Sequence, residues 1–244
     1  MREYGVDLPN GFELPPIDGA GNDYSFLEQR IRDGTPDLPI SIILPVYNRI
    51  EMLRRTMAML THQTYPLNLM EIVIADDGSD DHPEQLIDEF KSYFEVNYVR
   101  QRDEGYRLSH IRNLGVRAAR HDNIIILDCD MAPVPNLVEL FAKWLSLDEK
   151  LILIGHRRYV DANSLPVKKV MKSPSVMLEL PPVATNNAVM KQSPSKDWRE
   201  AIYSQTDNLK NSPHPFRASS CGNVAFHRRV FEHAGPFDER FTAW

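Results

Sequence analysis

The chain has little of what defines several large classes of protein. Of its 244 residues only Cys129 and Cys221 are cysteines, and they do not form a Cys-x-x-Cys pair. This argues against a disulfide framework or a structural zinc site and fits a reducing compartment. No apolar run approaches the roughly 18 residues of a membrane span, and the amino terminus lacks the basic-then-apolar pattern of a secretion signal. We therefore expect no transmembrane span and a cytoplasmic protein, with peripheral attachment to the inner face of the membrane left open.

An excess of positive charge is also lacking. The formal net charge is −6, so the chain carries no electrostatic footprint for nucleic acid, and we expect no nucleic-acid partner. A content of 42% hydrophobic and 25% charged residues is typical of an ordinary globular protein. The length suits a single α/β domain with at most an appendage.

The pattern along the chain divides it near residue 40. Residues 1–39 hold five of the eleven glycines and five of the eighteen prolines, which indicates an extended arm with one short helical turn near 24–32. Residues 40–244 form the predicted domain. Its first half is 40–155 and its second half is 156–244. Within the second half, 156–216 is rich in proline and predicts a long excursion over the active face.

Apolar runs alternate with amphipathic segments in the first half. Strands are predicted at 40–44, 71–75, 96–100 and 124–128, with a further strand at 222–226. Helices are predicted at 49–63, 83–93, 108–120 and 228–233. Alternation of this kind predicts a Rossmann-like α/β fold with a mainly parallel central sheet and helices on both faces.

In such a sheet the ligand lies beyond the carboxyl ends of the strands. Three of those ends carry polar clusters, at 45–49, 76–79 and 128–130. The first cluster reads Pro-Val-Tyr-Asn-Arg where a dehydrogenase would need a glycine-rich phosphate loop, which disfavours that class of enzyme.

The third cluster places Asp128 and Asp130 two residues apart at the end of an apolar run. In an extended segment these side chains point the same way, with Cα atoms about 6.6 Å apart. At about 6 Å and a dielectric of about 20 their repulsion is roughly 2.8 kcal/mol, so a divalent cation or a hydroxyl-rich ligand is the natural neutraliser. Cys129, between them, is expected to point away as a small buried apolar residue.

Together with Arg112-Asn113-Leu114-Gly115, the three clusters resemble the family-two glycosyltransferases in order and spacing. The resemblance is closer to the first transferase module of bacterial chondroitin and hyaluronan polymerases. The segments that carry this closer resemblance are 128–133, 197–199, 206–209, 215–217 and 222–226. The resemblance covers about residues 40–244 and implies the A-type glycosyltransferase fold and an inverting reaction. It also implies that 40–155 is the nucleotide-binding half of the domain and 156–244 the sugar and acceptor half.

The resemblance also implies roles for residues in the nucleotide half. Pro45 and Tyr47 would line the pocket of the base, although Tyr47 could equally be an aromatic at the sheet edge. Asp77, with Asp76 in reach, could accept a hydrogen bond from the imide N–H of the base; the simpler interpretation is a turn built by 76–79. Arg112, near the amino end of its helix, could hold phosphate or could be a solvated helix arginine.

For the acidic pair the resemblance implies that Asp128 contacts the ribose or sugar hydroxyls and that Asp130 binds Mn2+ or Mg2+ at the diphosphate. The same comparison gives four candidate contacts to sugar or acceptor, which are Trp198, Asp207, Asn208 and Arg217. For Trp198 the alternative is a packing anchor in a long loop. At Cys221 the similar polymerases commonly have glycine, so the choice of donor stays open.

The function implied is the transfer of GalNAc or GlcNAc from a UDP-sugar to a hydroxyl of a glycan acceptor. Two alternatives stay open: another UDP-sugar donor (glucose, galactose or glucuronate), and a non-catalytic nucleotide-sugar binding module. In the similar enzymes the general base lies in a Gly-Gly-Glu-Asp motif that would begin just after Trp244. We therefore expect the chain to be truncated before its catalytic base, since Asp238 and Glu239 belong to the preceding turn.

Overall fold

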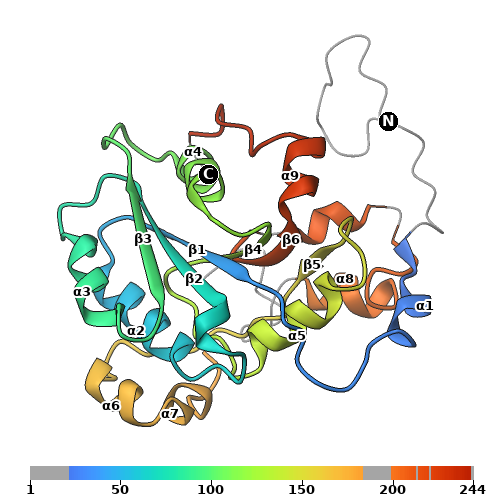
Figure 1. Cartoon of the computed structure of the whole chain (residues 1–244), viewed down its shortest axis with the longest axis horizontal. Helices are drawn as coiled ribbons and strands as arrows, with labels where there is room; N and C mark the ends of the chain where they lie inside the picture. Colours follow the sequence, from blue (N-terminus) through green and yellow to red (C-terminus); the bar gives the residue numbers. More distant parts are fainter. Residues whose placement is uncertain (1–21, 184–198, 213, 220, 243–244) are drawn as a thin grey trace.

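The computed structural model describes residues 22–183, 199–212, 214–219 and 221–242. In these residues a six-stranded sheet has the order β3-β2-β1-β4-β6-β5 (Figure 1). The strands are β1 Ile40–Val46, β2 Met70–Asp76, β3 Glu95–Arg100, β4 Asn123–Leu127, β5 Ile152–Ile154 and β6 Asn223–His227. The first four are mutually parallel, whereas β6 runs antiparallel to both β4 and β5. This confirms the mainly parallel sheet predicted from the sequence.

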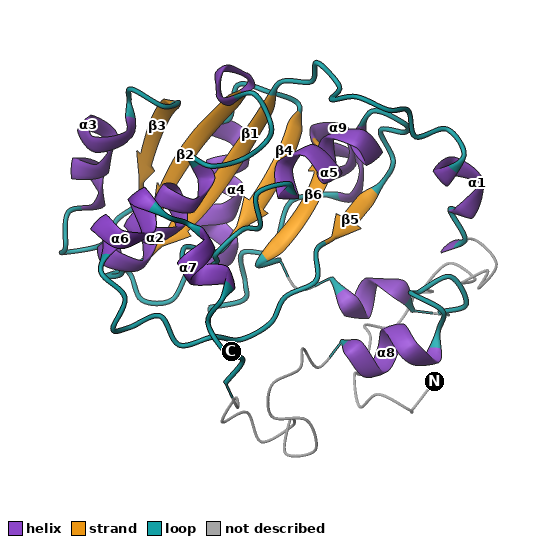
Figure 2. Ribbon diagram, turned by 90° about the horizontal axis from the view of Figure 1, so that it is seen from below, coloured by secondary structure: helices purple, strands orange, loops and turns teal. Residues whose placement is uncertain are grey.

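Helices cover both faces of this sheet (Figure 2). One face packs against α2 Ile50–Leu60, α3 Leu86–Phe90, α5 Leu137–Leu145, α6 Val167–Lys172 and α7 Ser175–Leu178. The other face packs against α4 Leu108–Ala118 and α9 Arg228–Ala234. Alternate residues of β1 pack into the two layers: Ile42 and Leu44 pack into the first, and Ile43 packs into the second. Burial on both faces explains why β1, β2 and β4 are continuous apolar runs instead of alternating ones.

Helix α4 lies very close to the sheet. A Cβ atom added to Gly115 would stand 2.5 Å from Cγ2 of Ile43 and 3.3 Å from Cβ of Ala75, so only glycine permits this approach. The amino end of α4 is thereby fixed next to the carboxyl ends of β1 and β2, where the candidate site lies.

The predicted elements of the first half are confirmed, with helices shorter than expected. The segment 83–93 forms a 3-10 turn, η3 Pro83–Gln85, followed by α3. Another 3-10 turn, η2 Leu67–Leu69, precedes β2, and the helical turn of the arm is α1 Ser25–Glu28. Helix α5 was not predicted, although its buried residues Val138, Phe141, Ala142 and Leu145 have helical spacing.

The excursion is more structured than expected, and part of it borders the candidate site, namely 156–163, Met177, Leu178 and Glu200. Besides α6 and α7 it contains α8 Glu200–Gln205 and η5 Pro215–Ala218. Helices α6 and α7 lie against the outer side of α2, where Nε of Arg55 donates to the carbonyl of Leu165 at 3.1 Å and His62 contacts the carbonyl of Met171 at 3.0 Å. Of the described part, the segment that borders the candidate site is therefore mainly 156–163. No helix in the described residues is long and apolar enough to cross a membrane.

Candidate active site

The loop after β2 is built around Asp76. Its Oδ1 accepts from the backbone N–H of Ser79 at 2.8 Å and its Oδ2 from the hydroxyl of Tyr98 at 2.6 Å, while Nη1 of Arg100 lies 3.5 Å away. The side chain of Asp76 is fully buried. Burial and this carboxylate raise the pKa of Tyr98. In this structure Asp76 therefore supports the loop and has no surface toward the crevice, so of the two acidic residues Asp77 is the one placed to read a base.

Asp77 lies at the crevice edge with 6% of its surface exposed. Its carboxylate accepts from Nε2 of Gln101 and from the backbone N–H of Arg107 at 3.3 Å. Its own N–H donates to the carbonyl of Val46 at 2.9 Å, which ties the loop to the end of β1. Burial raises the pKa of Asp77, although these two donors and the charge of Arg107 oppose that rise.

Tyr47 and Pro45 come from the end of β1. The side chain of Tyr47 is 45% exposed, and its hydroxyl donates to Oδ2 of Asp103 at 3.0 Å, a contact that raises the pKa of Tyr47. Its ring is thus available for stacking, as predicted for a base contact. Pro45 is buried in the sheet opposite Ala75, so it shapes the pocket only through the backbone.

Arg112 projects from the second turn of α4 toward the end of β4. Its Nη2 donates to Oδ1 of Asp128 at 3.0 Å, and its guanidinium lies 6.0 Å from the centre of the Phe237 ring. Asp128 is anchored in turn by its N–H, which donates to the carbonyl of Gly222 at 3.0 Å. A Cβ on Gly222 would stand 2.2 Å from Oδ2 of Asp128, so any larger residue here would displace that carboxylate. Arg112 is therefore a partly buried partner of Asp128 and not a solvated helix arginine.

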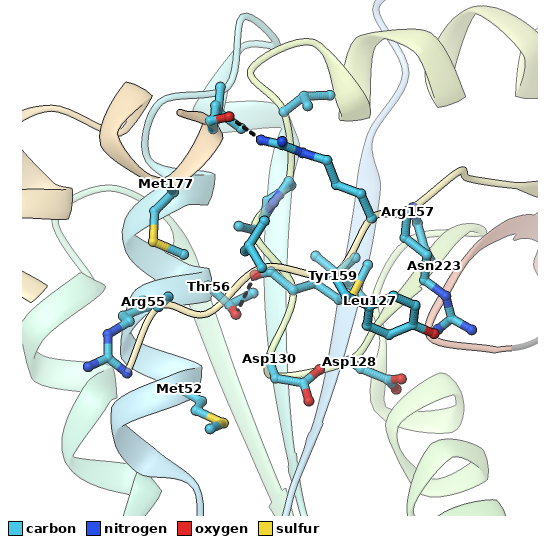
Figure 3. A pocket seen from close by; sticks show the side chains of 18 of the residues that line it. Met52, Arg55, Thr56, Leu127, Asp128, Asp130, Arg157, Tyr159, Met177 and Asn223 are labelled. Carbon is cyan, nitrogen blue, oxygen red and sulfur yellow. Dashed lines mark hydrogen bonds between the residues drawn. The ribbon is translucent and has the colours of Figure 1, made fainter. Parts of the chain in front are cut away.

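Asp128 and Asp130 point into one cavity of about 710 Å³. Figure 3 shows their carboxylates next to each other, with Thr56 of α2 on one side and Asn223 of β6 on the other. The sequence spacing predicted this shared orientation. Desolvation and the neighbouring Asp128 raise the pKa of Asp130, while Arg49 and Arg157 act against that rise. A pair of like charges held in this way is a place where a cation stabilises the ionised form.

The loop that carries the pair is fixed from beneath. The buried hydroxyl of Thr56 lies 2.7 Å from the carbonyl oxygens of both Cys129 and Met131. Cys129 packs into the core, and burial raises the pKa of its thiol to about 12, so it is not available as a metal ligand. This agrees with the expectation that Cys129 points away from the acidic pair.

The carboxylates of Asp128 and Asp130 fit a hard divalent cation that takes most of its ligands from phosphate and water oxygens. In the part of the chain that the structure describes, no group of three or more His, Cys, Asp or Glu side chains could hold a metal. Mg2+ and Mn2+ commonly bind through one or two carboxylates and complete their shell with phosphate and water oxygens. Because Arg112 already contacts one oxygen of Asp128, Asp130 is the better placed of the two as a metal ligand.

Of the predicted site residues that the structure describes, Asp128 and Asp130 line this cavity, whereas Pro45, Tyr47, Asp76, Asp77, Arg112, Asp207 and Asn208 do not. Asp207, Asn208 and Leu209 form a left-handed turn after α8 with φ values of 48°, 53° and 72°, and the carbonyl of Leu209 accepts from Nδ2 of Asn22 at 2.8 Å. Neither Asp207 nor Asn208 lines the cavity. Trp198 and the side chain of Arg217 lie outside the described residues.

Several residues at the site were not singled out from the sequence. His156, Glu200 and Asn223 line the cavity, and Gln101 contacts Asp77. Arg199 is fully buried and donates to the carbonyls of Gly155 and Ala218 at 3.2 and 3.3 Å, which ties the start of α8 to β5. A buried arginine has no signal in a single sequence, because its position depends on carbonyl groups distant along the chain.

The sheet order, the helix layers and the acidic pair at the end of β4 define an α/β fold of the glycosyltransferase A type. Solved structures agree: TarS from S. aureus superposes with a TM-score of 0.56 at 14% identity, over 84% of this chain and 31% of TarS. The mannosyltransferase PcManGT from Pyrobaculum calidifontis, in complex with GDP-Man and Mn2+, superposes with a TM-score of 0.50 at 16% identity, over 88% of this chain and 54% of PcManGT.

The chain belongs to glycosyl transferase family 2, whose profile matches residues 41–235. It is 39% identical to chondroitin synthase from Escherichia coli and 36% identical to hyaluronan synthase from Pasteurella multocida, in each case over 98% of this chain. The matched regions are 36% and 25% of those relatives, so the chain spans about a quarter to a third of their length. The resemblance inferred from the motifs is thereby confirmed.

Proposed function

We propose that this chain is a metal-dependent, inverting transferase domain that moves GalNAc or GlcNAc from a UDP-sugar to a hydroxyl of a glycan acceptor. The observation that carries the proposal is the pair Asp128 and Asp130, which project together into one cavity beside the guanidinium of Arg112. The likeness to two chondroitin synthases and a hyaluronan synthase supports a hexosamine donor and a growing glycan as acceptor.

The roles follow from the chemistry of each side chain. Asp77 accepts the imide N–H of the base, which only a carboxylate or carbonyl can do, while the exposed ring of Tyr47 provides a stacking surface. Asp128, held by Arg112, accepts hydroxyl groups of the ribose or sugar. Asp130 holds the divalent cation. When bound, that cation would neutralise the negative charge on the departing diphosphate.

The acidic pair faces a cavity with both apolar and polar walls. The cavity is lined on one side by Met52 and Met131 and on the other by the segment 156–163. Arg112 and Asp128 form an ion pair at 3.0 Å, which orients both side chains at the site. Cys221 lies close enough to this pair for both charges to act on its thiol, which makes it the residue most able to change donor choice.

Asp130→Ala tests the proposal. Calorimetric titration of the purified chain with UDP, UDP-GalNAc and UDP-GlcNAc, in Mn2+ and then in chelator, should show metal-dependent binding that the variant loses. The matched control is Asp148→Ala, an exposed aspartate whose carboxylate bonds only to the N–H of Lys150 in a surface turn. Equal UDP affinity in Mn2+ for Asp130→Ala and for the unmodified chain would overturn the metal site.

Release of UDP in the presence of a glycan acceptor distinguishes an enzyme from a binding module. Turnover supports transfer, whereas tight metal-dependent binding with no turnover supports the non-catalytic alternative. Titration with UDP-glucose, UDP-galactose and UDP-glucuronate decides between donors.

A further inference from the structure

Three side chains from three elements form a continuous hydrogen-bonded row at the crevice edge. Asp77 follows β2, Gln101 follows β3, and His110 lies in the first turn of α4. Nε2 of Gln101 contacts a carboxylate oxygen of Asp77, and Oε1 of Gln101 contacts Nδ1 of His110. Gln101 is held at its backbone as well, because its N–H donates to the carbonyl of Asp76 at 3.0 Å.

The direction of every hydrogen bond in this row is fixed by chemistry. An ionised carboxylate only accepts, so Gln101 must present its amide NH2 to Asp77 and its carbonyl oxygen to His110. That carbonyl oxygen also only accepts, so Nδ1 of His110 carries a proton. On the other side of the ring, Nε2 of His110 faces Oε2 of Glu239 at 3.9 Å. In both hydrogen bonds of the row, the donor therefore lies on the His110 side and the acceptor on the Asp77 side.

We propose that Gln101 and His110 are positioning residues that keep Asp77 an ionised, acceptor-only group and so make the site select uracil over cytosine. The proposal rests on the function proposed above, in which Asp77 reads the base. Uracil presents an N–H donor at N3, whereas cytosine presents a lone pair there. An ionised Asp77 therefore attracts the first base and repels the second.

The surroundings of Asp77 explain why it needs this support. Asp77 is almost fully buried, and burial disfavours the ionised form and raises its pKa. Two donors oppose burial, the amide of Gln101 and the backbone N–H of Arg107. The charge of Arg107 acts with them, while Asp103 acts against them. Without His110, the carbonyl oxygen of Gln101 loses its donor, so one of the two side-chain contacts that orient the amide toward Asp77 is missing.

The experiment compares UDP and CDP binding in Mn2+ by calorimetry, because the two nucleotides share the diphosphate and differ only in the base. The ratio of the two affinities is the measured quantity. A loss of folded protein lowers both affinities equally, so it cancels from the ratio. His110→Ala and Gln101→Leu should each reduce the preference for UDP by about tenfold or more, the effect expected when a charged group loses a buried hydrogen bond.

Two further variants separate positioning from general damage. His110→Asn places an amide N–H near the position of Nδ1 and should retain a preference within about threefold of the original, since it restores the donor. The double variant Gln101→Leu with His110→Ala should be no less selective than Gln101→Leu alone, because His110 acts only through Gln101. Glu239→Gln, which removes the charge facing the ring, is the control and should leave the ratio unchanged.

The outcomes are distinct. Absence of UDP binding by the unmodified chain overturns the proposed function and this inference together. A clear UDP preference that persists in His110→Ala and Gln101→Leu overturns the inference and leaves the proposed function standing. Additive losses in the double variant also overturn it, because they show that the two residues act independently.

Discussion

At the scale of single residues, the site is a set of carboxylates in different surroundings. Asp76 is fully buried and satisfied by protein donors, Asp77 is nearly buried with two donors, and Asp130 shares a cavity with Asp128. The sequence shows all four as acidic residues after strands and gives them similar weight. Their surroundings assign one to structure and leave the others to ligand binding.

The raised pKa of Asp77 gives a prediction on pH. Because its pKa lies above the ordinary value of 3.8, Asp77 takes up a proton at higher pH than an exposed aspartate does. A protonated Asp77 no longer accepts from N3 of uracil, so the preference for UDP over CDP should be full at neutral pH and fall on acidification. Titration from about pH 7.5 to about pH 4 reaches the unperturbed aspartate value and so covers the range in which Asp77 takes up its proton.

The comparison variant for this experiment is Asp77→Asn. The amide of this variant does not titrate, so the ratio of its UDP affinity to its CDP affinity should be small and should not change with pH. A ratio that stays constant with pH in the unmodified chain would show that Asp77 does not read the base.

At the scale of elements, the important contacts join a loop at one strand end to a helix that is distant in sequence. Thr56 of α2 binds the loop of Asp128–Met131 through two carbonyls, and Gly115 of α4 allows that helix to approach β1. The sequence predicted both helices and the strand. It did not indicate that one hydroxyl supports the acidic pair.

Thr56→Val tests that support. The substitution keeps the shape of the side chain and removes the hydroxyl, which leaves buried carbonyls without their donor and should cost about 1–3 kcal/mol of unfolding free energy. Metal-dependent UDP affinity should fall in the same variant, because the position of Asp130 depends on this loop. Denaturant unfolding and calorimetry measure the two effects.

Thr56→Ser keeps the hydroxyl and should restore most of the UDP affinity. Thr61→Val is the control, since the hydroxyl of Thr61 bonds only to the carbonyl of Ala58 within its own helix turn. If Thr56→Val is destabilised yet binds UDP normally, Thr56 has no positioning role.

At the scale of the whole molecule, the antiparallel strand β6 and helix α9 join the second half of the chain to the nucleotide half. Arg228, at the start of α9, donates to the carbonyls of Ala119 and His121 at 2.6 and 3.0 Å and reaches Oδ1 of Asp122 at 3.2 Å. This guanidinium therefore fastens α9 to the turn between α4 and β4. The arrangement uses the several donors of arginine at once.

Arg228→Lys should lower the free energy of unfolding by about 1–3 kcal/mol, because a single ammonium cannot reach all the carbonyls that the guanidinium serves. Thermal unfolding measures the loss. Arg229→Lys is a matched control, since Arg229 is an exposed neighbour whose Nη1 pairs with Glu149 at 2.7 Å on the surface. An Arg228→Lys variant as stable as the unmodified chain would mean that charge alone, and not the shape of the guanidinium, explains the contact.

The sequence by itself determined the strands, their parallel order through helical crossovers, and the clustering of acidic residues beyond the strand ends. These follow from local patterns, since a strand buried on both faces must be continuously apolar and crossovers of this length place strand ends at one edge. The sequence also predicted that Asp128 and Asp130 point the same way, although Cys129 and Asp130 lie in a turn after β4 and not in the extended segment that the prediction assumed.

Only the tertiary structure decided which of those residues face the crevice. The burial of Asp76, the ion pair of Arg112 with Asp128, and the row Asp77, Gln101 and His110 each depend on groups from different elements. The turn of Asp207 and Asn208 likewise lies away from the cavity because α8 directs it toward Asn22. Such contacts are set by how elements pack in space, and a local pattern in the chain does not contain that information.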